Sequence, residues 1–221
     1  MEYSAVAPEI AIRAYEWHRG FAASNIFILP RSEGQYLSIV EEGQAWCLCD
    51  EGNFLGLAYC VPSMHNGKRE WELGGLTLAT SMKGNKAGST LMRLALGDVL
   101  FQNDPFKRHE RVITHCLKDN PDPQKLFQSL KFTHVGTVPV PAELARGLSS
   151  NDADGVVRGL EFELIEPAAL EALASWCEGW KGALADGTPV TILLRPETSL
   201  QDWAFAFRDM ASKLPTKAKA N

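Results

Sequence analysis

The sequence predicts an α/β fold in which helices flank a central sheet, followed by a C-terminal helical extension. Hydrophobic spacing is helical near the N-terminus and becomes strand-like from residue 44 onward. A strand then leads through a short glycine-containing loop into another helix. The length of 221 residues and a hydrophobic content of 45% supply enough material for one sizeable core with a modest appendage.

The first half begins with helices and continues with strands. Apolar and aromatic residues recur at helical spacing over 10–24, and a shorter helix is expected over 31–42 after Pro30. Alternating patterns then predict strands, with an Asn-Gly turn at residues 66–67 that suits positive φ. The expected strands cover residues 45–49, 54–61 and 69–80.

The second half alternates helices and strands before the extension. The strand over 69–80 is followed by helix 89–101, strand 111–117, helix 124–130 and strands 134–140 and 156–165. The polar loop 141–155 is longer than a hairpin needs, so we expect it to be mobile when empty and to border a substrate site. We therefore divide the chain into a domain over 1–165 and an extension over 166–221, which contains two amphipathic helices around a strand at 190–194.

Composition disfavours several classes of function. The chain has 22 basic and 27 acidic residues, a net charge of −5, so no basic excess indicates nucleic-acid binding. We find neither a signal peptide nor the ~20 apolar residues of a spanning helix, and we expect a cytoplasmic protein that does not bind membranes. The five cysteines are expected to be reduced. Cys47 and Cys49 have no second Cys or His pair at ligand spacing, so no metal is expected.

A loop between strand 69–80 and helix 89–101 is a candidate phosphate site. Backbone N–H groups at a helix N-terminus attract negative charge, glycines permit close approach, and lysines add positive charge. A pyrophosphate would fit there, although an ordinary glycine turn with solvated lysines is the alternative. The loop consists of Lys83, Gly84, Asn85, Lys86, Ala87, Gly88 and Ser89.

Three segments in order resemble the GNAT superfamily of acyl-CoA-dependent N-acyltransferases. The family loop reads Arg or Gln, two residues, Gly, one residue, then Gly or Ala, and Lys83, Lys86 and Gly88 hold the three defining positions. The segment 71–78 resembles the family strand before this loop. Asn120, followed by Leu126 and Phe132, is similar to the family segment after the next strand, although Lys131 replaces its usual Gly. The resemblance extends over residues 5–165.

The resemblance implies a mixed, mostly antiparallel sheet and acetyl-CoA as the acyl donor. Backbone groups of Leu76, Thr77 and Leu78 would then pair with the pantetheine amides, and the loop 83–89 would bind the pyrophosphate. Asn120 would contact the cofactor from the following strand. The acceptor would be a primary amine of a small molecule or a protein, and the chain would act alone or as a homodimer.

Glu72 stands where several family members place a general base, since an amine must lose a proton before it attacks and a carboxylate can accept it if burial raises its pKa. Alternatively, Glu72 faces solvent or pairs with Arg69. Phe127 occupies the position of the family's tyrosine acid and has no proton to donate. The thiolate then takes a proton from water, another group substitutes, or the protein no longer catalyses. His65, His115 and His134 look like isolated structural or solvated histidines.

Three functions are compatible with these residues. The first is an N-acetyltransferase that moves an acetyl group from acetyl-CoA to an amine. The second is a catalytically inactive module of the same fold that binds CoA or a protein partner in a regulatory role, because Lys86, Phe127 and Lys131 depart from the family pattern. The third is an unrelated α/β interaction protein. Binding of acetyl-CoA separates the third from the others, and release of CoA separates the first two.

Overall fold

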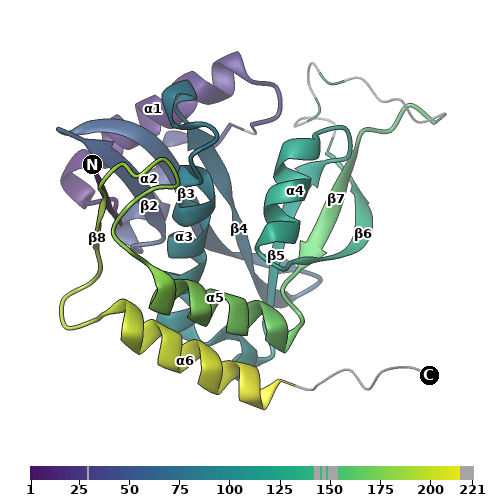
Figure 1. Cartoon of the computed structure of the whole chain (residues 1–221). Helices are drawn as coiled ribbons and strands as arrows, with labels where there is room; N and C mark the ends of the chain where they lie inside the picture. Colours follow the sequence, from purple (N-terminus) through teal and green to yellow (C-terminus); the bar gives the residue numbers. More distant parts are fainter. Residues whose placement is uncertain (29, 142–144, 146–147, 149–153, 215–221) are drawn as a thin grey trace.

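Within the described residues, a mixed sheet of eight strands forms the centre of the molecule (Figure 1). The computed structural model describes residues 1–28, 30–141, 145, 148 and 154–214. The spatial order of the strands is β6-β7-β5-β4-β3-β2-β1-β8. Their bounds are Glu2–Ala5 (β1), Ala45–Asp50 (β2), Asn53–His65 (β3), Lys68–Leu78 (β4), Arg111–Leu117 (β5), Thr133–Pro139 (β6), Arg158–Glu163 (β7) and Thr191–Leu193 (β8).

Helices cover both faces of the sheet, and each face has its own core. Along β3, Ala58 and Cys60 belong to one hydrophobic cluster, while Leu57, Tyr59 and Val61 belong to the other, as the alternation of a strand requires. One cluster includes residues of α1 (Ala11–Ser24) and α2 (Glu33–Glu41). The other includes residues of α3 (Ala87–Asn103), α4 (Pro121–Ser129), α5 (Pro167–Gly179) and α6 (Leu200–Lys213).

The parallel strands β4 and β5 separate halfway along their length (Figure 1). They pair only from Glu70↔Arg111 to Glu72↔Ile113. Beyond this point β4 continues beside β3, whereas β5 continues beside β7. The Thr114 hydroxyl donates a 2.7 Å hydrogen bond to the Leu73 carbonyl where the strands part. The rest of β4 therefore has a free edge toward β5.

A bulge in β4 follows the separation. Tyr59 lies opposite Gly74 and Leu57 opposite Thr77, so β4 carries an extra residue here. Gly75 adopts a φ of 63°, which favours glycine. A Cβ atom at Gly75 would also lie 1.9 Å from a ring carbon of Tyr59. Glycine is thus required both by the backbone and by the tyrosine packed against it.

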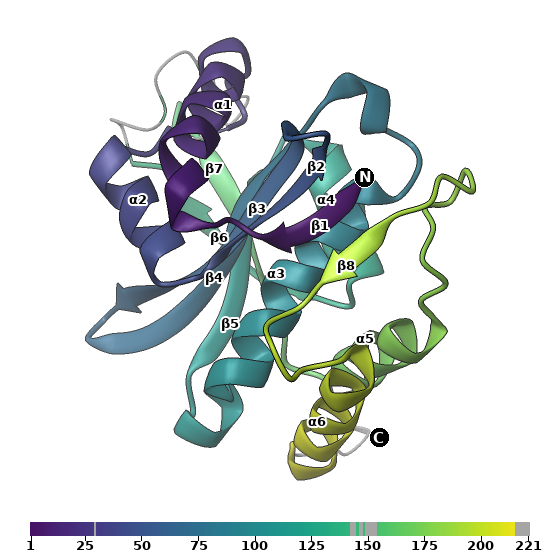
Figure 2. The same cartoon turned by 90° about the vertical axis from the view of Figure 1, so that its left-hand side faces the viewer.

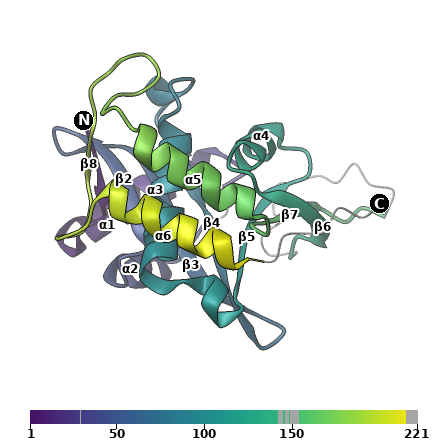
Figure 3. The same ribbon diagram turned by 60° about the horizontal axis from the view of Figure 1, so that its bottom comes forward.

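The C-terminal extension shares the core and the sheet. Helices α5 and α6 lie side by side (Figure 3), and the Trp203 indole of α6 packs so closely on α3 that a Cβ at Gly97 would lie 2.6 Å from it. Strand β8 pairs in parallel with β1 at the edge of the sheet (Figure 2). Arg195, just after β8, forms an ion pair with the buried Asp98 of α3.

Most expected elements are present, with shifted ends. The strand predicted over 111–117 has these bounds, whereas α4 begins at Pro121 because proline suits the first turn of a helix. Strand β1 was not predicted. The loop 141–155 lies largely outside the described residues, so its mobility and its place beside the acceptor site stay predictions. Among the residues placed by the structure, no helix is long and apolar enough to cross a membrane.

Candidate functional site

The free edge of β4 carries the three residues expected to pair with pantetheine. Leu76, Thr77 and Leu78 lie beyond the last β4–β5 pair, so their backbone groups on the β5 side have no strand partner in the described sheet. The Thr77 hydroxyl is buried and has no hydrogen-bond partner among the described residues. An extended amide-containing chain can add to such an edge as a strand would.

The loop after β4 supplies donors to an anion. Gly84 and Lys86 have φ angles of 85° and 67°, and α3 begins at Ala87. The side-chain oxygen of Asn85 accepts the Ala87 N–H at 3.0 Å. Within the described part of the chain, the N–H groups of Gly88 and Ser89 have no acceptor, as is usual in the first turn of a helix. Together with the exposed Lys83, they suit a pyrophosphate.

The backbone angle at Lys86 explains why the family pattern has glycine at this position. Its φ of 67° is left-handed, a conformation that costs a residue with a side chain about 1–2 kcal/mol. The lysine keeps the backbone path that the glycine would give and adds a positive charge beside the start of α3. The altered motif position is therefore compatible with the same loop.

Asn120 lies at the start of the second helix that follows the parallel strands. It immediately precedes α4, as Lys86 precedes α3, and both helices follow the C-terminal ends of β4 and β5. The two helix N-termini thus lie at the same end of the sheet. The half-buried side-chain amide of Asn120 makes no hydrogen bond within the described residues. It is available to a ligand that enters between β4 and β5.

Glu72 lies on the face of β4 that points toward α1 and α2, where it contacts a histidine. Its Oε1 atom is 3.1 Å from Nδ1 of His115 on β5, and Nε2 of His115 is 3.2 Å from Oε2 of Glu161 on β7. Each ring nitrogen of the imidazole therefore faces a carboxylate. We call these three residues the carboxylate–histidine unit. Its position is the last β4–β5 pair, just before the strands separate.

Pairing outweighs burial in the pKa values of this unit. Burial alone would lower the pKa of His115, but the hydrogen bonds and charges of Glu72 and Glu161 raise it above its usual 6.5. Burial alone would raise the pKa of Glu72, but His115, with a further contribution from Arg31, holds it below its usual 4.5. A pKa raised by burial, the condition under which Glu72 alone could accept the proton, is therefore not met, because the hydrogen bond and charge of His115 outweigh burial.

Arg111 links the three strands that carry the carboxylate–histidine unit. Its guanidinium lies 3.3 Å from Glu70, 2.6 Å from Glu161 and 2.8 Å from Glu163. These contacts join β4, β5 and β7, and Glu161 is shared between Arg111 and His115. A charge-assisted network of this kind restrains the rotamers of all its members.

The other candidates do not join this site. Phe127 is buried, with its ring 5.6 Å from that of Phe162. His134 lies against the same Phe162 ring, and His65 is exposed beside Asn66 in the β3–β4 turn. Among the described residues, no group of three or more His, Cys, Asp or Glu side chains is arranged so that it could hold a metal ion.

Sequence reasoning undervalued His115 and missed Glu161. The alternation of side chains along a strand already predicts that Ile113, His115 and Leu117 share one face of β5. The pairing of His115 with Glu161 depends on the β5–β7 register, which hydrophobic periodicity does not give.

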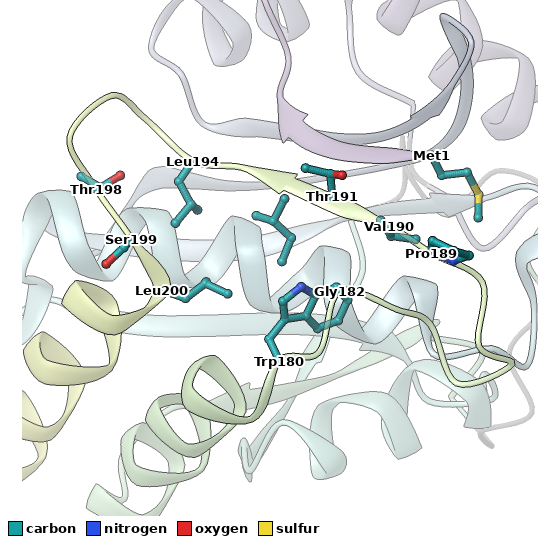
Figure 4. Close-up of a pocket in the computed structure, with 11 residues that line it drawn as sticks. Met1, Trp180, Gly182, Pro189, Val190, Thr191, Leu194, Thr198, Ser199 and Leu200 are labelled. Carbon is teal, nitrogen blue, oxygen red and sulfur yellow. The ribbon is translucent and has the colours of Figure 1, made fainter.

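A separate hollow of about 730 Å³ lies in the extension (Figure 4). Figure 4 shows Trp180 and Leu200 on one side of it, facing Val190 and Leu194 of the β8 segment. Strand β8 is at the edge of the sheet, with three strands between it and β4. This hollow is therefore distinct from the β4–β5 site.

Comparisons with known proteins show the family of the chain. The model of the acetyltransferase (GNAT) family matches residues 11–132, more than half of the chain. The chain belongs to the GNAT acetyltransferase family. As a member it is an acetyltransferase, and its donor is acetyl-CoA. No curated protein matches the sequence.

Solved GNAT structures share the fold at low identity. A GNAT-family acetyltransferase from Streptococcus pneumoniae has a TM-score of 0.54 at 13% identity, covering 73% of this chain and 98% of its own. A ribosomal-protein-alanine N-acetyltransferase from Brucella melitensis has a TM-score of 0.52 at 15% identity, covering 73% and 99%. A putative acetyltransferase from Salmonella typhimurium, solved with acetyl-CoA, has a TM-score of 0.53 at 14% identity, covering 73% and 91%.

Proposed function

We propose that this GNAT protein transfers the acetyl group of acetyl-CoA to a primary amine, with the carboxylate–histidine unit as proton acceptor. The observation that carries the proposal is the placement of His115 between Glu72 and Glu161 at the point where β4 and β5 separate. The cofactor residues are the β4 edge Leu76, Thr77 and Leu78, the loop from Lys83 to Ser89, and Asn120. Support comes from the β4 edge, the Gly88 and Ser89 N–H groups and the Asn120 side-chain amide, which have no hydrogen-bond partner among the described residues.

A primary ammonium loses two protons as it becomes an amide nitrogen. The first passes to the unit through Glu72 and leaves a neutral amine that can attack. Acetyl-CoA supplies an acetyl group activated as a thioester, so the nitrogen–carbon bond forms and the carbon–sulfur bond breaks. The second proton then leaves the nitrogen to water, and the released thiolate takes a proton from water, because Phe127 has none to donate.

The charge of the unit sets its pH dependence. With His115 protonated, two carboxylates and one imidazolium give a net charge of −1, and the unit is a weak base. Loss of the imidazolium proton gives a charge of −2 and a site able to accept a proton. Because the pKa of His115 is raised, we expect kcat/KM to increase as pH rises through a value above 6.5.

Two substitutions test the unit. Glu72→Gln keeps the shape of the side chain but removes its basicity, and His115→Asn removes the titrating ring. Each should lower the rate of CoA release by about 10²- to 10⁴-fold, with partial recovery at high pH, where more of the amine is already neutral. Affinity for acetyl-CoA should barely change, and His134→Asn, on a ring outside the unit, is the control.

Steady-state rates of CoA release by the wild type and the variants, measured between about pH 6 and pH 9.5, test whether the unit accepts the proton. Rates of both variants within threefold of wild type at every pH would remove the unit from the mechanism. Binding of acetyl-CoA without CoA release from any amine would instead support the inactive regulatory module.

A further inference from the structure

Arg31 is a cation beside the proposed active site that forms no ion pair with a carboxylate of the described residues. Its Nε–H donates a 2.6 Å hydrogen bond to the Tyr59 hydroxyl, and its guanidinium lies 4.6 Å from the centre of the Tyr59 ring. Among the described residues, no acidic group forms a salt bridge with Arg31, and its two terminal nitrogens have no acceptor. Arg111, on the same face, is in contact with three glutamates. Arg31 can therefore accept an anion from outside, whereas Arg111 is saturated.

Arg31 borders an open hollow of about 420 Å³ between α2 and β3. Gln35 and Val61 also line this hollow. Val61 is the register partner of Glu72, and side chains directly opposite on one face of a sheet lie about 5 Å apart at Cβ. The charge of Arg31 also contributes to the lowered pKa of Glu72. The hollow thus has Arg31 in its lining, and Glu72 lies beside it as the strand partner of Val61. The carboxylate in the lining itself is that of Glu42, which accepts a hydrogen bond from the Gln44 side chain.

Two buried polar side chains lie behind Arg31 without partners. His18 and Tyr36 are each 1% exposed, their rings stack at 5.5 Å, and neither the ring nitrogens nor the hydroxyl has a hydrogen-bond partner among the described residues. Burial and the charge of Arg31 lower the pKa of His18 to about 4, so this ring is neutral at neutral pH. The positive charge of this region consequently comes from Arg31. Unpaired buried polar groups of this kind are costly and are concentrated at functional sites.

We propose that the acceptor is a small free amino acid. Its carboxylate binds the terminal nitrogens of Arg31, and its ammonium group binds Glu72. The inference rests on the proposed function, because it places the reacting amine at the carboxylate–histidine unit. A guanidinium binds a carboxylate through two parallel hydrogen bonds, and an amino acid carries its opposite charges a short distance apart. The N-terminus of a peptide has an amide in place of the carboxylate and would leave Arg31 unpaired.

Matched pairs of probes test this specificity. CoA release is measured with the free amino acids and with the corresponding amino acid amides at equal concentration. We expect the preferred amino acid to exceed its amide by about 10- to 100-fold in kcat/KM, the range expected for one charge-assisted pair. Arg31→Gln should abolish this preference, and Arg31→Lys should restore part of it. Arg13→Gln is the control, since it removes an arginine that lies 5.8 Å from the Phe54 ring, outside the hollow.

A binding experiment separates this inference from the proposed function. Thermal unfolding of the protein with CoA is compared in the presence of each amino acid and its amide. If no amine releases CoA but an amino acid stabilises the wild type and not Arg31→Gln, the subsite stands and the proposed function fails. Amides that react as fast as amino acids, or a preference that survives Arg31→Gln, would overturn the inference. Absence of both turnover and selective stabilisation would overturn it as well.

Discussion

At the scale of single residues, the direction of a histidine pKa shift depends on whether carboxylates offset the effect of burial. His115 and His18 are both sheltered histidines, yet their pKa values shift in opposite directions. His115 lies between two glutamates, so its charged form is favoured. His18 has no acidic partner among the described residues and lies close to Arg31, so burial and repulsion favour its neutral form. The sequence does not show this difference, because the carboxylates that contact His115 lie 43 and 46 residues away along the chain.

The first prediction follows for His18. Its pKa is about 4 in the folded protein and near 6.5 in the unfolded chain, so the unfolded chain binds more protons between these values. The free energy of unfolding should therefore decrease as pH falls through this window. His18→Phe retains a ring against Tyr36 and removes the titration. Urea unfolding should show a larger stabilisation by His18→Phe at about pH 5 than at about pH 8. An equal effect at both pH values would contradict the shift.

At the scale of elements, hydrophobic periodicity predicted most helices and strands but not the register between neighbouring strands. Strand 111–117 and the helix of the extension at 200–213 follow clear patterns. The four-residue β1 is too short to show a period, and its place between β2 and β8 depends on tertiary pairing. The same limitation explains why Glu72 was nominated without His115. Their contact requires the parallel β4–β5 register, and only the folded sheet fixes it.

The cofactor loop gives an element-scale prediction. A Cβ at Gly88 would lie 3.3 Å from a terminal carbon of Leu76, so α3 begins in direct contact with the β4 edge. Gly88→Ala requires only a small shift of the Leu76 side chain, so this variant should bind acetyl-CoA nearly as well as the wild type does. Gly88→Glu adds a carboxylate to the first turn of α3, where an anion should bind, and should abolish binding at high micromolar cofactor. Calorimetry checks both variants, and equal affinity of Gly88→Glu and wild type would show that the site is misplaced.

At the scale of the whole molecule, the extension is coupled to the cofactor loop as well as to the core. Trp203 packs on α3, Arg195 pairs with Asp98 of the same helix, and the Ala185 N–H donates a 3.1 Å hydrogen bond to the Asn85 carbonyl. Helix α3 thus begins at the anion-binding loop and is held along its length by residues that follow position 166. Composition suggested an appendage packed on the domain. The structure adds that this appendage contacts the loop expected to bind the pyrophosphate.

The hydrogen bond from Ala185 to Asn85 leads to a prediction about the affinity for acetyl-CoA. Ala185→Pro removes the N–H donor to Asn85, whereas Ala185→Ser changes the side chain and retains the donor. Loss of one hydrogen bond that positions the loop should weaken acetyl-CoA binding by about 2- to 12-fold. The rate at saturating acetyl-CoA should stay near that of wild type, because the carboxylate–histidine unit lies on β4, β5 and β7, outside the loop. Calorimetry and steady-state kinetics on both variants, with melting temperatures to verify folding, separate the two effects. Equal affinity for Ala185→Pro and Ala185→Ser would mean that the loop holds its conformation without the extension.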